Sequence, residues 1–295
     1  MFKLAAFTDE ITQDFGRAVA VAREFGLDGV EIRSVWDHPP QDIPQPDVAR
    51  MKAILKDTGL KVCCIASPFF KCELDSEKEC REHLDILRRC IALGKAFDCR
   101  LIRGFTFWRR KPAVRLWEQP LWRQILDKFA EPIRILEEND AVMAIENESS
   151  TYIGAGAALA RFLKELGSDR VRATWDPANS FHDSEGAETP FPDGYRAILP
   201  YTVHVHIKDC RRNDKGGVEH TAVGEGQIGW PEHFRQLKAD GYDGYASLET
   251  HWRISKELAE DQVNRPGGKA YSESGELASR ICLENIVEMV RPLRT

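Results

Sequence analysis

The chain has 295 residues, of which 42% are hydrophobic and 9% aromatic, as expected for a globular protein of one large domain or two smaller ones. Its 41 basic and 47 acidic residues give a formal net charge of −6, and no window gathers Lys and Arg into a long stripe, so a nucleic-acid partner is disfavoured. No apolar run reaches membrane-spanning length, and Asp9 and Glu10 come before any signal-peptide core can develop. We therefore expect a soluble, cytoplasmic protein with no membrane partner. The eight cysteines have neither CxxC nor zinc-finger spacing, which predicts reduced, mostly buried thiols.

Short β-rich segments alternate with amphipathic segments along the whole chain. The β-rich segments cover residues 4–8, 29–34, 61–67, 101–107, 142–148, 171–177, 202–209 and 244–252. The intervening segments carry apolar residues at i, i+3 and i+4, which is typical of helices that pack one face on a sheet. Eight βα units in a row predict an α/β fold with a parallel sheet, and the count favours a single closed (β/α)8 TIM barrel over a doubly wound sheet. Because no linker-like stretch interrupts the units, we expect one domain over residues 1–295.

Two glycine-containing segments follow predicted strands. Residues 255–274 form the longest irregular stretch, and their place after the last strand puts them on the C-terminal face of a barrel, where active-site lids lie. The sequence GEGQIG at 224–229 lacks the strand-to-helix signature of a phosphate loop, so we expect a flexible rim loop there.

Polar side chains occupy one face of the strand predicted at 202–209. His204, His206 and Lys208 alternate with aliphatic residues, although a buried strand would carry Val or Ile at these positions. A single histidine on such a face is more often a hydrogen-bonded core residue than a ligand. Residues on other predicted strands are therefore needed to show whether this face has a chemical role.

Four consecutive predicted strands, the fifth to the eighth, end in a potential metal ligand. The ligands are Glu146, Asp176, His206 and Glu249. The C-terminal ends of barrel strands converge on one cavity, and burying several carboxylates together without a cation is costly. Any one of these residues alone could be a capped or salt-bridged strand end, but four together favour one shared divalent ion. Three carboxylates and one imidazole suit Mn²⁺, Mg²⁺ or Co²⁺, while Zn²⁺ and iron remain alternatives.

At these residues the chain resembles the xylose-isomerase-like TIM-barrel family of sugar phosphate isomerases and epimerases, which includes ketose 3-epimerases and inosose dehydratases. The resemblance runs over nearly the whole chain and is carried by GLDGVEIR, AIEN, WDPAN, HVHIKD, GEGQIGW and GYDGYASLE. It implies one divalent ion, Mn²⁺ first, held by Glu146, Asp176, His206 and Glu249. Arg212, six residues after His206, matches a substrate-contacting arginine of the epimerase branch. Asn179 stands where that branch usually carries a histidine.

Further polar and aromatic residues fall at the predicted rim. Lys208 is expected to bind substrate oxygens, with an ion pair to Asp209 or a nearby acid as the alternative. Arg103, Asn179 and Trp252 are further candidates for substrate binding, although core packing is an equal alternative for any tryptophan. His204 is expected to be a hydrogen-bonded core residue.

These residues predict a metal-dependent isomerase or epimerase that acts on a sugar or sugar derivative. The first step would remove a carbon-bound proton next to a metal-bound carbonyl, with Glu146 and Glu249 as paired catalytic base and acid. The same enolate can expel a β-hydroxyl, so a dehydratase or other lyase acting on a keto-sugar or inosose is the alternative. A DNA-repair endonuclease is disfavoured because the chain has only eight histidines and a net charge of −6, and a non-catalytic binding protein is the remaining class. The expected partner is a small carbohydrate, and the resemblance implies a homo-oligomer.

Overall fold

The strands form a closed parallel barrel, as the sequence predicts. A computed structural model describes residues 1–109, 119–183, 188–254 and 257–294. The strand order is β1-β10-β7-β6-β5-β4-β3-β2. Each predicted strand is present, with its ends shifted by a few residues: β1 Lys3–Phe7, β2 Gly29–Ile32, β3 Lys61–Phe69, β4 Leu101–Gly104, β5 Val142–Glu146, β6 Val171–Trp175, β7 Thr202–Ile207 and β10 Tyr245–Leu248.

Helices follow the strands in the alternation that the sequence pattern indicates. The longer ones are α2 Phe15–Glu24, α3 Gln45–Leu55, α4 Glu77–Ala96, α5 Gln119–Asp127, α6 Ala130–Asn139, α7 Gly156–Leu166, α10 Trp230–Ala239 and α13 Gly275–Val290. Short helices are α1 Thr8–Ile11, α8 Pro177–His182, α9 Tyr195–Ile198, α11 Glu260–Asn264 and α12 Gly268–Ser272. Within the described residues, no helix is long and apolar enough to cross a membrane. All eight cysteines are buried thiols, as predicted.

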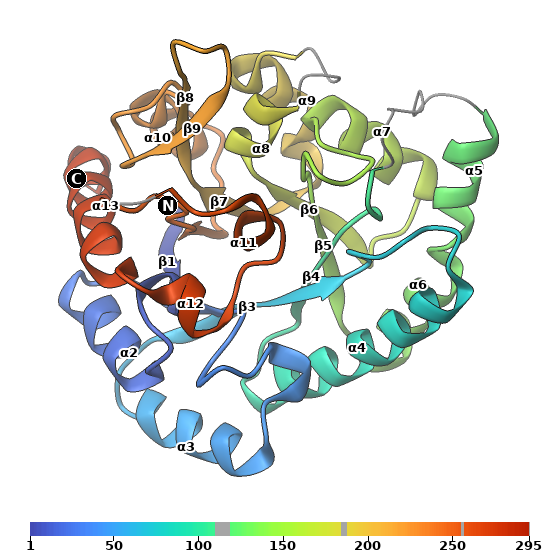
Figure 1. Cartoon of the computed structure of the whole chain (residues 1–295), viewed down its shortest axis with the longest axis horizontal. Helices are drawn as coiled ribbons and strands as arrows, with labels where there is room; N and C mark the ends of the chain where they lie inside the picture. Colours follow the sequence, from blue (N-terminus) through green and yellow to red (C-terminus); the bar gives the residue numbers. More distant parts are fainter. Residues whose placement is uncertain (110–118, 184–187, 255–256, 295) are drawn as a thin grey trace. The chain divides into compact units, whose positions relative to one another are not determined.

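The chain divides into two compact units, and the prediction of a single domain stays a prediction. The first unit contains residues 1–63 and 204–295, and the second contains residues 64–203. In the first unit, β10 pairs with both β7 and β1, and β1 also pairs with β2. Figure 1 shows α2, α3 and α13 outside the strands of this unit. In the second unit, β4 pairs with β3 and β5, and β5 pairs with β6.

Register in the first unit decides which side chains meet at the strand ends. Ser247 of β10 lies opposite His206 of β7, and the backbone N–H of Glu249 donates to the carbonyl oxygen of Ile207 at 2.9 Å. Lys208 and Glu249 therefore leave their strands side by side. The same alternation buries His204, His206 and Lys208 on one face, as the sequence indicates.

The structure contains a hairpin after β7 that the sequence analysis did not predict. Strands β8 (Asp209–Arg212) and β9 (Val218–Thr221) pair antiparallel, from Asp209 opposite Thr221 to Arg212 opposite Val218. Behind the hairpin, the Asp209 carboxylate accepts backbone N–H groups at 2.8–3.3 Å, from Cys210, Gly224, Gly226 and Ile228. The expectation of a flexible rim loop at 224–229 is therefore wrong, because the loop is wrapped around a buried carboxylate.

The expectation of an irregular stretch at 255–274 is also wrong for about half of its length, where the segment is helical. Residues 255–256 lie outside the described residues, but α11 and α12 occupy much of the remainder. The segment is tied to the N-terminal part of the chain, since Gly268 N donates to Ser34 Oγ at 3.1 Å and Ser272 Oγ donates to the carbonyl oxygen of Asp9 at 2.6 Å. Short helices fixed in this way give the segment a defined position in the first unit.

Helix α1 is held by the start of α13. Ser279 Oγ donates to the carbonyl oxygen of Glu10 at 3.1 Å, and a Cβ atom placed on Gly275 would lie only 2.1 Å from that oxygen. Glycine at 275 is therefore what allows α13 to approach the backbone of α1. Since α1 carries Asp9 and Glu10, this approach also fixes two buried acids.

We expect Gly275→Ala to lower the free energy of unfolding by about 1 to 3 kcal/mol, because the added methyl group must push two backbones apart. Urea unfolding measures the change. Leu277→Ala, in the same helix but 59% exposed, is the control and should shift stability by less than about 0.5 kcal/mol. Equal midpoints for the wild type and Gly275→Ala would contradict the close approach.

Candidate functional site

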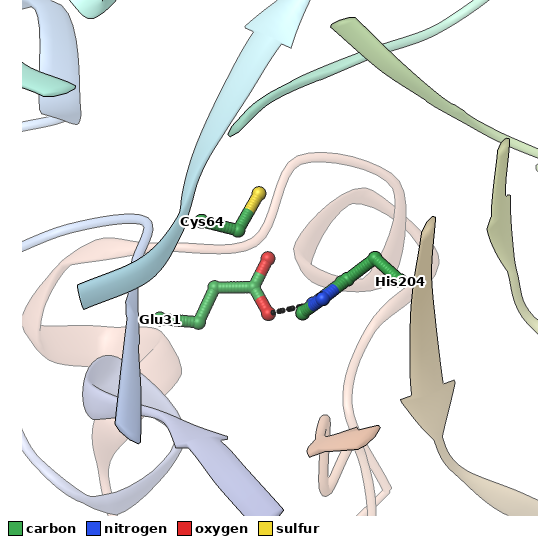
Figure 2. Close-up of side chains that lie close together, drawn as sticks. All are labelled: Glu31, Cys64 and His204. Atoms are coloured by element: carbon green, nitrogen blue, oxygen red, sulfur yellow. Dashed lines mark hydrogen bonds and ion pairs between the residues drawn. The ribbon is translucent and has the colours of Figure 1, made fainter. Parts of the chain in front are cut away.

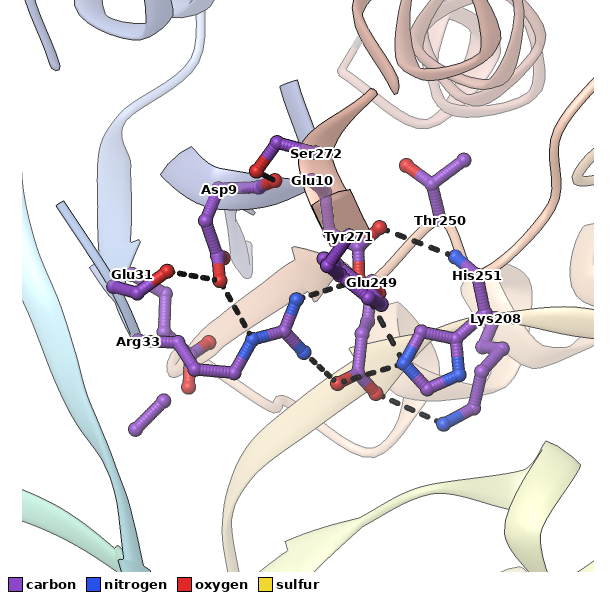
Figure 3. Close-up of polar contacts among 12 residues, drawn as sticks. Asp9, Glu10, Glu31, Arg33, Lys208, Glu249, Thr250, His251, Tyr271 and Ser272 are labelled. Carbon is purple, nitrogen blue, oxygen red and sulfur yellow. Dashed lines mark hydrogen bonds and ion pairs between the residues drawn. The ribbon is translucent and has the colours of Figure 1, made fainter. Parts of the chain in front are cut away.

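A buried ionic cluster lies at the C-terminal ends of four adjacent strands in the first unit. The strands are neighbours in the order β7-β10-β1-β2. The residues that follow their ends are Lys208, Glu249, the pair Asp9 and Glu10, and Arg33, all 3% exposed or less. Figure 3 shows these side chains directed toward one another. The cluster therefore arises from the common direction of parallel strands, which brings together residues far apart in the sequence.

Glu249 has cationic partners on both carboxylate oxygens. Arg33 Nη1 donates to Oε1 at 2.7 Å, and Lys208 Nζ donates to Oε2 at 2.8 Å. The His251 Nε2 atom lies 3.4 Å from Oε1. Burial alone would raise the pKa of Glu249, but Lys208, His251 and Arg33 outweigh it and hold the pKa well below its usual range. Glu249 is thus a buried, ionised carboxylate.

Glu10 is the second fully buried carboxylate of the cluster. It accepts from Arg33 Nη2 at 2.8 Å, and both terminal nitrogens of Arg253 lie 3.4 Å from its Oε2 atom. The Tyr271 hydroxyl also donates to it. Burial raises the pKa of Glu10, but Arg33, His251 and Arg253 together lower it by more, so that the net result is a pKa of about 2. Asp9 differs, because burial outweighs Arg33 and raises its pKa.

A second buried group, formed by Glu31, His204 and His206, lies deeper on the same side of these strands. His204 Nε2 lies 2.8 Å from Glu31 Oε2, as Figure 2 shows, and His206 Nε2 lies 3.4 Å from Glu31 Oε1. Burial would raise the pKa of Glu31, but the two imidazoles hold it well below the usual range. Because β10 and β1 separate β7 from β2, these side chains must all point to the concave side of the strands. The prediction that His204 is a hydrogen-bonded core residue is confirmed.

The second unit contains its own buried acid at a strand end. Glu146, the last residue of β5, accepts from Arg103 Nη1 at 3.1 Å through Oε2 and from Asn179 Nδ2 at 3.0 Å through Oε1. Arg103 lies in β4 and Asn179 in α8, so three elements meet at this carboxylate. All three residues are buried, at 5% exposure or less. The predicted site residues Glu146, Arg103 and Asn179 are therefore in contact.

Asp176 follows β6 and begins the short helix α8. Its Oδ1 atom accepts the backbone N–H groups of Ala178 and Asn179 at 2.9 and 3.0 Å, which is the N-cap arrangement. The backbone of Asp176 is fixed by Asn147, whose side chain accepts from its N–H at 2.9 Å and donates to its carbonyl oxygen at 2.8 Å. The cap thus gives Asp176 a structural task in addition to any role as a ligand.

The remaining predicted site residues have different positions. Lys208 is paired with an acid, as the alternative interpretation held, but the acid is Glu249 and not Asp209. Arg212 is exposed on β8, where its backbone N–H donates to Gln227 Oε1 at 2.8 Å. Trp252 is half-buried. In the first unit, His206 lies near Glu249, with 3.9 Å between His206 Nδ1 and Glu249 Oε2.

Buried acids and histidines that could bind a metal are present in the described residues. One set within the first unit is Glu10, Glu249 and His251, whose donor atoms lie within 4.8 Å of one another. Arg33 donates to both of these carboxylates, however, so a guanidinium already supplies the cation that they require. The four predicted ligands Glu146, Asp176, His206 and Glu249 are each 2% exposed or less.

Sequence reasoning missed the anchoring part of the cluster, namely Asp9, Glu10, Arg33, Arg253 and Tyr271. Asp9 and Glu10 lie directly after β1, and Arg33 follows β2, so their position at strand ends was a signal that could have found them. Tyr271 and Arg253 offered no such signal. Tyr271 reaches Glu10 from α12, and Arg253 Nη2 donates to the carbonyl oxygen of Tyr271 at 2.9 Å.

Glu10 should make the folded state sensitive to acid. A carboxyl group with a lower pKa in the folded chain stabilises the fold above its unfolded pKa of 4.5, and this contribution is lost as the pH falls toward about 2. The contribution is on the order of 3 kcal/mol. Urea unfolding between pH 6 and pH 3 should show a shallower loss of stability for Glu10→Gln than for the wild type. Parallel curves would mean that the pKa of Glu10 is the same in the folded and the unfolded chain.

Comparison with known proteins agrees with this architecture. The family described as xylose isomerase-like TIM barrel matches residues 19–276. An uncharacterized protein of Methanocaldococcus jannaschii is 28% identical over 133 residues, 43% of this chain and 44% of that protein, so the match spans less than half of this relative.

The D-psicose 3-epimerase of Clostridium cellulolyticum H10, solved with D-tagatose, is 15% identical with a TM-score of 0.73 over 98% of this chain and 99% of that one. The probable 3-DHS dehydratase AsbF of Bacillus anthracis is 16% identical with a TM-score of 0.69 over 94% and 98%. The chain belongs to the xylose isomerase-like TIM barrel family.

Proposed function

We propose that the protein is a divalent-metal-dependent isomerase or epimerase of a sugar or sugar derivative. The observation that carries the proposal is the set of buried acids and a histidine at the C-terminal ends of β5, β6, β7 and β10, in a chain of this family. Active sites of TIM barrels are built at that end of the strands. The likeness in fold to a D-psicose 3-epimerase supports a small carbohydrate as the partner.

The donor set fits a divalent ion. Glu146, Asp176, His206 and Glu249 would hold it, and three carboxylates with one imidazole match the preference of Mn²⁺, with Mg²⁺, Co²⁺ and Zn²⁺ as alternatives. Glu146 and Glu249 each accept from cationic side chains, so both are buried acids that positive charge stabilises. A bound ion would act as a Lewis acid on the substrate carbonyl and stabilise an enediolate.

The residues around these ligands have defined tasks in the proposed reaction. Glu249 or Glu146 removes the proton from the carbon next to the carbonyl, and the other carboxyl group returns it. Lys208 lies against Glu249 Oε2 and can turn its ammonium group toward a substrate oxygen when that carboxylate gains another cation. Arg103 and Asn179 keep Glu146 in one orientation. Arg212 and Trp252 are proposed to contact the substrate from the rim.

A dehydratase or other lyase is the second candidate, supported by the likeness in fold to the probable 3-DHS dehydratase. Elimination and isomerisation share proton removal as their first step, so the same residues serve both. The products distinguish the two reactions. Loss of water with a new enone absorbance indicates elimination, while an unchanged molecular formula indicates isomerisation.

We expect the purified protein to bind about one divalent ion per chain and to lose thermal stability when the ion is chelated, because a ligand that binds only the folded state stabilises it. Elemental analysis after mild purification and thermal unfolding with and without EDTA measure both effects. The double variant His206→Ala, Asp176→Ala should contain no stoichiometric metal.

The matched control for metal content is Lys208→Met. This change removes a contact to Glu249 Oε2 but no proposed ligand, so the variant should keep its metal and lose turnover. Stoichiometric metal in the double variant would refute the proposed ligand set. Metal loss in Lys208→Met would instead make Lys208 part of the structure that holds the ion.

In deuterium oxide, a competent substrate should exchange the hydrogen next to its carbonyl with solvent. Glu249→Gln keeps an oxygen donor but removes the base, so we expect it to lose most of the exchange, about 100-fold or more, while keeping part of the metal. Proton NMR follows the exchange. Glu146→Gln is tested in parallel, and full exchange in both variants would show that neither glutamate is the base.

A further inference from the structure

The guanidinium group of Arg33 is fixed along its edges by three carboxylates. Its Nε atom donates to Asp9 Oδ2 at 2.9 Å, Nη2 donates to Glu10 Oε1 at 2.8 Å, and Nη1 donates to Glu249 Oε1 at 2.7 Å. The residue is only 3% exposed. Figure 3 shows the group between Asp9 on one side and Glu249 on the other. A planar fork with donors in fixed directions cannot rotate without breaking at least one of these bonds.

Two aromatic rings also lie close to the same group. The Arg33 Cζ atom lies 4.7 Å from the ring centroid of Phe7 and 4.7 Å from that of Tyr271. Phe7 ends β1 and Tyr271 belongs to α12. Each contact is a cation–π interaction in a desolvated setting, where such contacts are strongest. Rings and carboxylates together leave the guanidinium group one orientation.

The acids that hold Arg33 are themselves held. Ser34 Oγ donates to Asp9 Oδ2 at 3.0 Å, and the backbone N–H of His251 donates to Glu10 Oε2 at 3.3 Å. The α1 backbone that carries both acids is tied to α12 and α13 through Ser272 and Ser279. The anchor is therefore a continuous network, and the bond from Arg33 to Glu249 connects it to the proposed site.

From this geometry we infer that Arg33 is a positioning residue for Glu249. Its Nη1 atom holds Oε1 of Glu249, so Oε2 is the oxygen presented to a divalent ion and to the substrate. The inference rests on the proposed function for what Glu249 does, but the contact that fixes Oε1 of this carboxylate is given by the geometry of Arg33 itself. A lysine at position 33 would keep the charge and lose the fork, because an ammonium group is a point charge without fixed directions.

The test compares Arg33→Lys with a control outside the network, Arg280→Lys. Arg280 of α13 donates to both carboxylate oxygens of Glu24 at 2.8 Å, so this change also replaces a guanidinium fork by an ammonium group. Binding of Mn²⁺ to the metal-free protein is measured by calorimetry, and kcat and KM are measured on the substrate that the wild type turns over. Arg33→Lys should weaken Mn²⁺ binding about 10- to 100-fold and lower kcat at least as much as it changes KM. Arg280→Lys should stay within about threefold of the wild type.

Equal losses in Arg33→Lys and Arg280→Lys would overturn the inference, because the loss would then not depend on the contact with Glu249. If Arg33→Lys does not fold, Asp9→Asn takes its place, since it loosens the guanidinium group on the side remote from Glu249. We expect a severalfold loss of Mn²⁺ affinity in that variant, and unchanged affinity would overturn the inference.

Different results would refute the proposed function and the inference about Arg33. A wild type that binds no divalent ion and turns over no sugar would refute the function, and metal-free crystal structures of the wild type and Arg33→Lys would then decide the inference by themselves. The inference requires a Glu249 carboxylate that is ordered in the wild type and rotated or disordered in the variant. An identical carboxylate in both structures would refute it.

Discussion

Burying ionised carboxylates at the ends of parallel strands imposes a strict requirement for nearby positive charge, and the surroundings of the candidate site follow from that requirement. Taking a carboxylate out of water is expensive unless a cation and hydrogen-bond donors replace the water. Glu249 has Arg33 and Lys208, Glu146 has Arg103, and Glu31 has two imidazoles. Each of these acids is thus matched by a basic side chain on, or directly after, another strand.

The two cationic partners of Glu249, Arg33 and Lys208, differ in how easily they can move. The Arg33 guanidinium is held by two further carboxyl groups and lies close to two aromatic rings, so its contact with Glu249 is rigid. Lys208 reaches the other oxygen through a flexible chain, and an ammonium group can change partner without loss of geometry. Glu249 therefore has one oxygen, Oε1, with a rigid partner and one oxygen, Oε2, whose partner can be exchanged. A carboxylate that binds different groups in turn requires both properties.

Much of the fold and part of the site could be predicted from the sequence. Alternating apolar residues predicted the eight barrel strands and the buried face of His204, His206 and Lys208. The common direction of parallel strands predicted a buried acid at the strand end that carries Glu146. The β8–β9 hairpin was not, because its sequences DCRR and VEHT have no apolar alternation. Arg33 was missed because an arginine after a strand resembles a surface residue, and its partner Glu249 lies 216 residues away.

The approach of α13 to α1 has a consequence for the order in which the chain folds. Residues 64–203 form a unit from one continuous stretch, whereas the other unit joins residues 1–63 to residues 204–295. During synthesis, β1 and the acids of α1 emerge from the ribosome before β10 and α13, with which they pair and pack. Glu249 lies 216 residues after Arg33, so the network around this carboxylate is completed only after β10 has emerged.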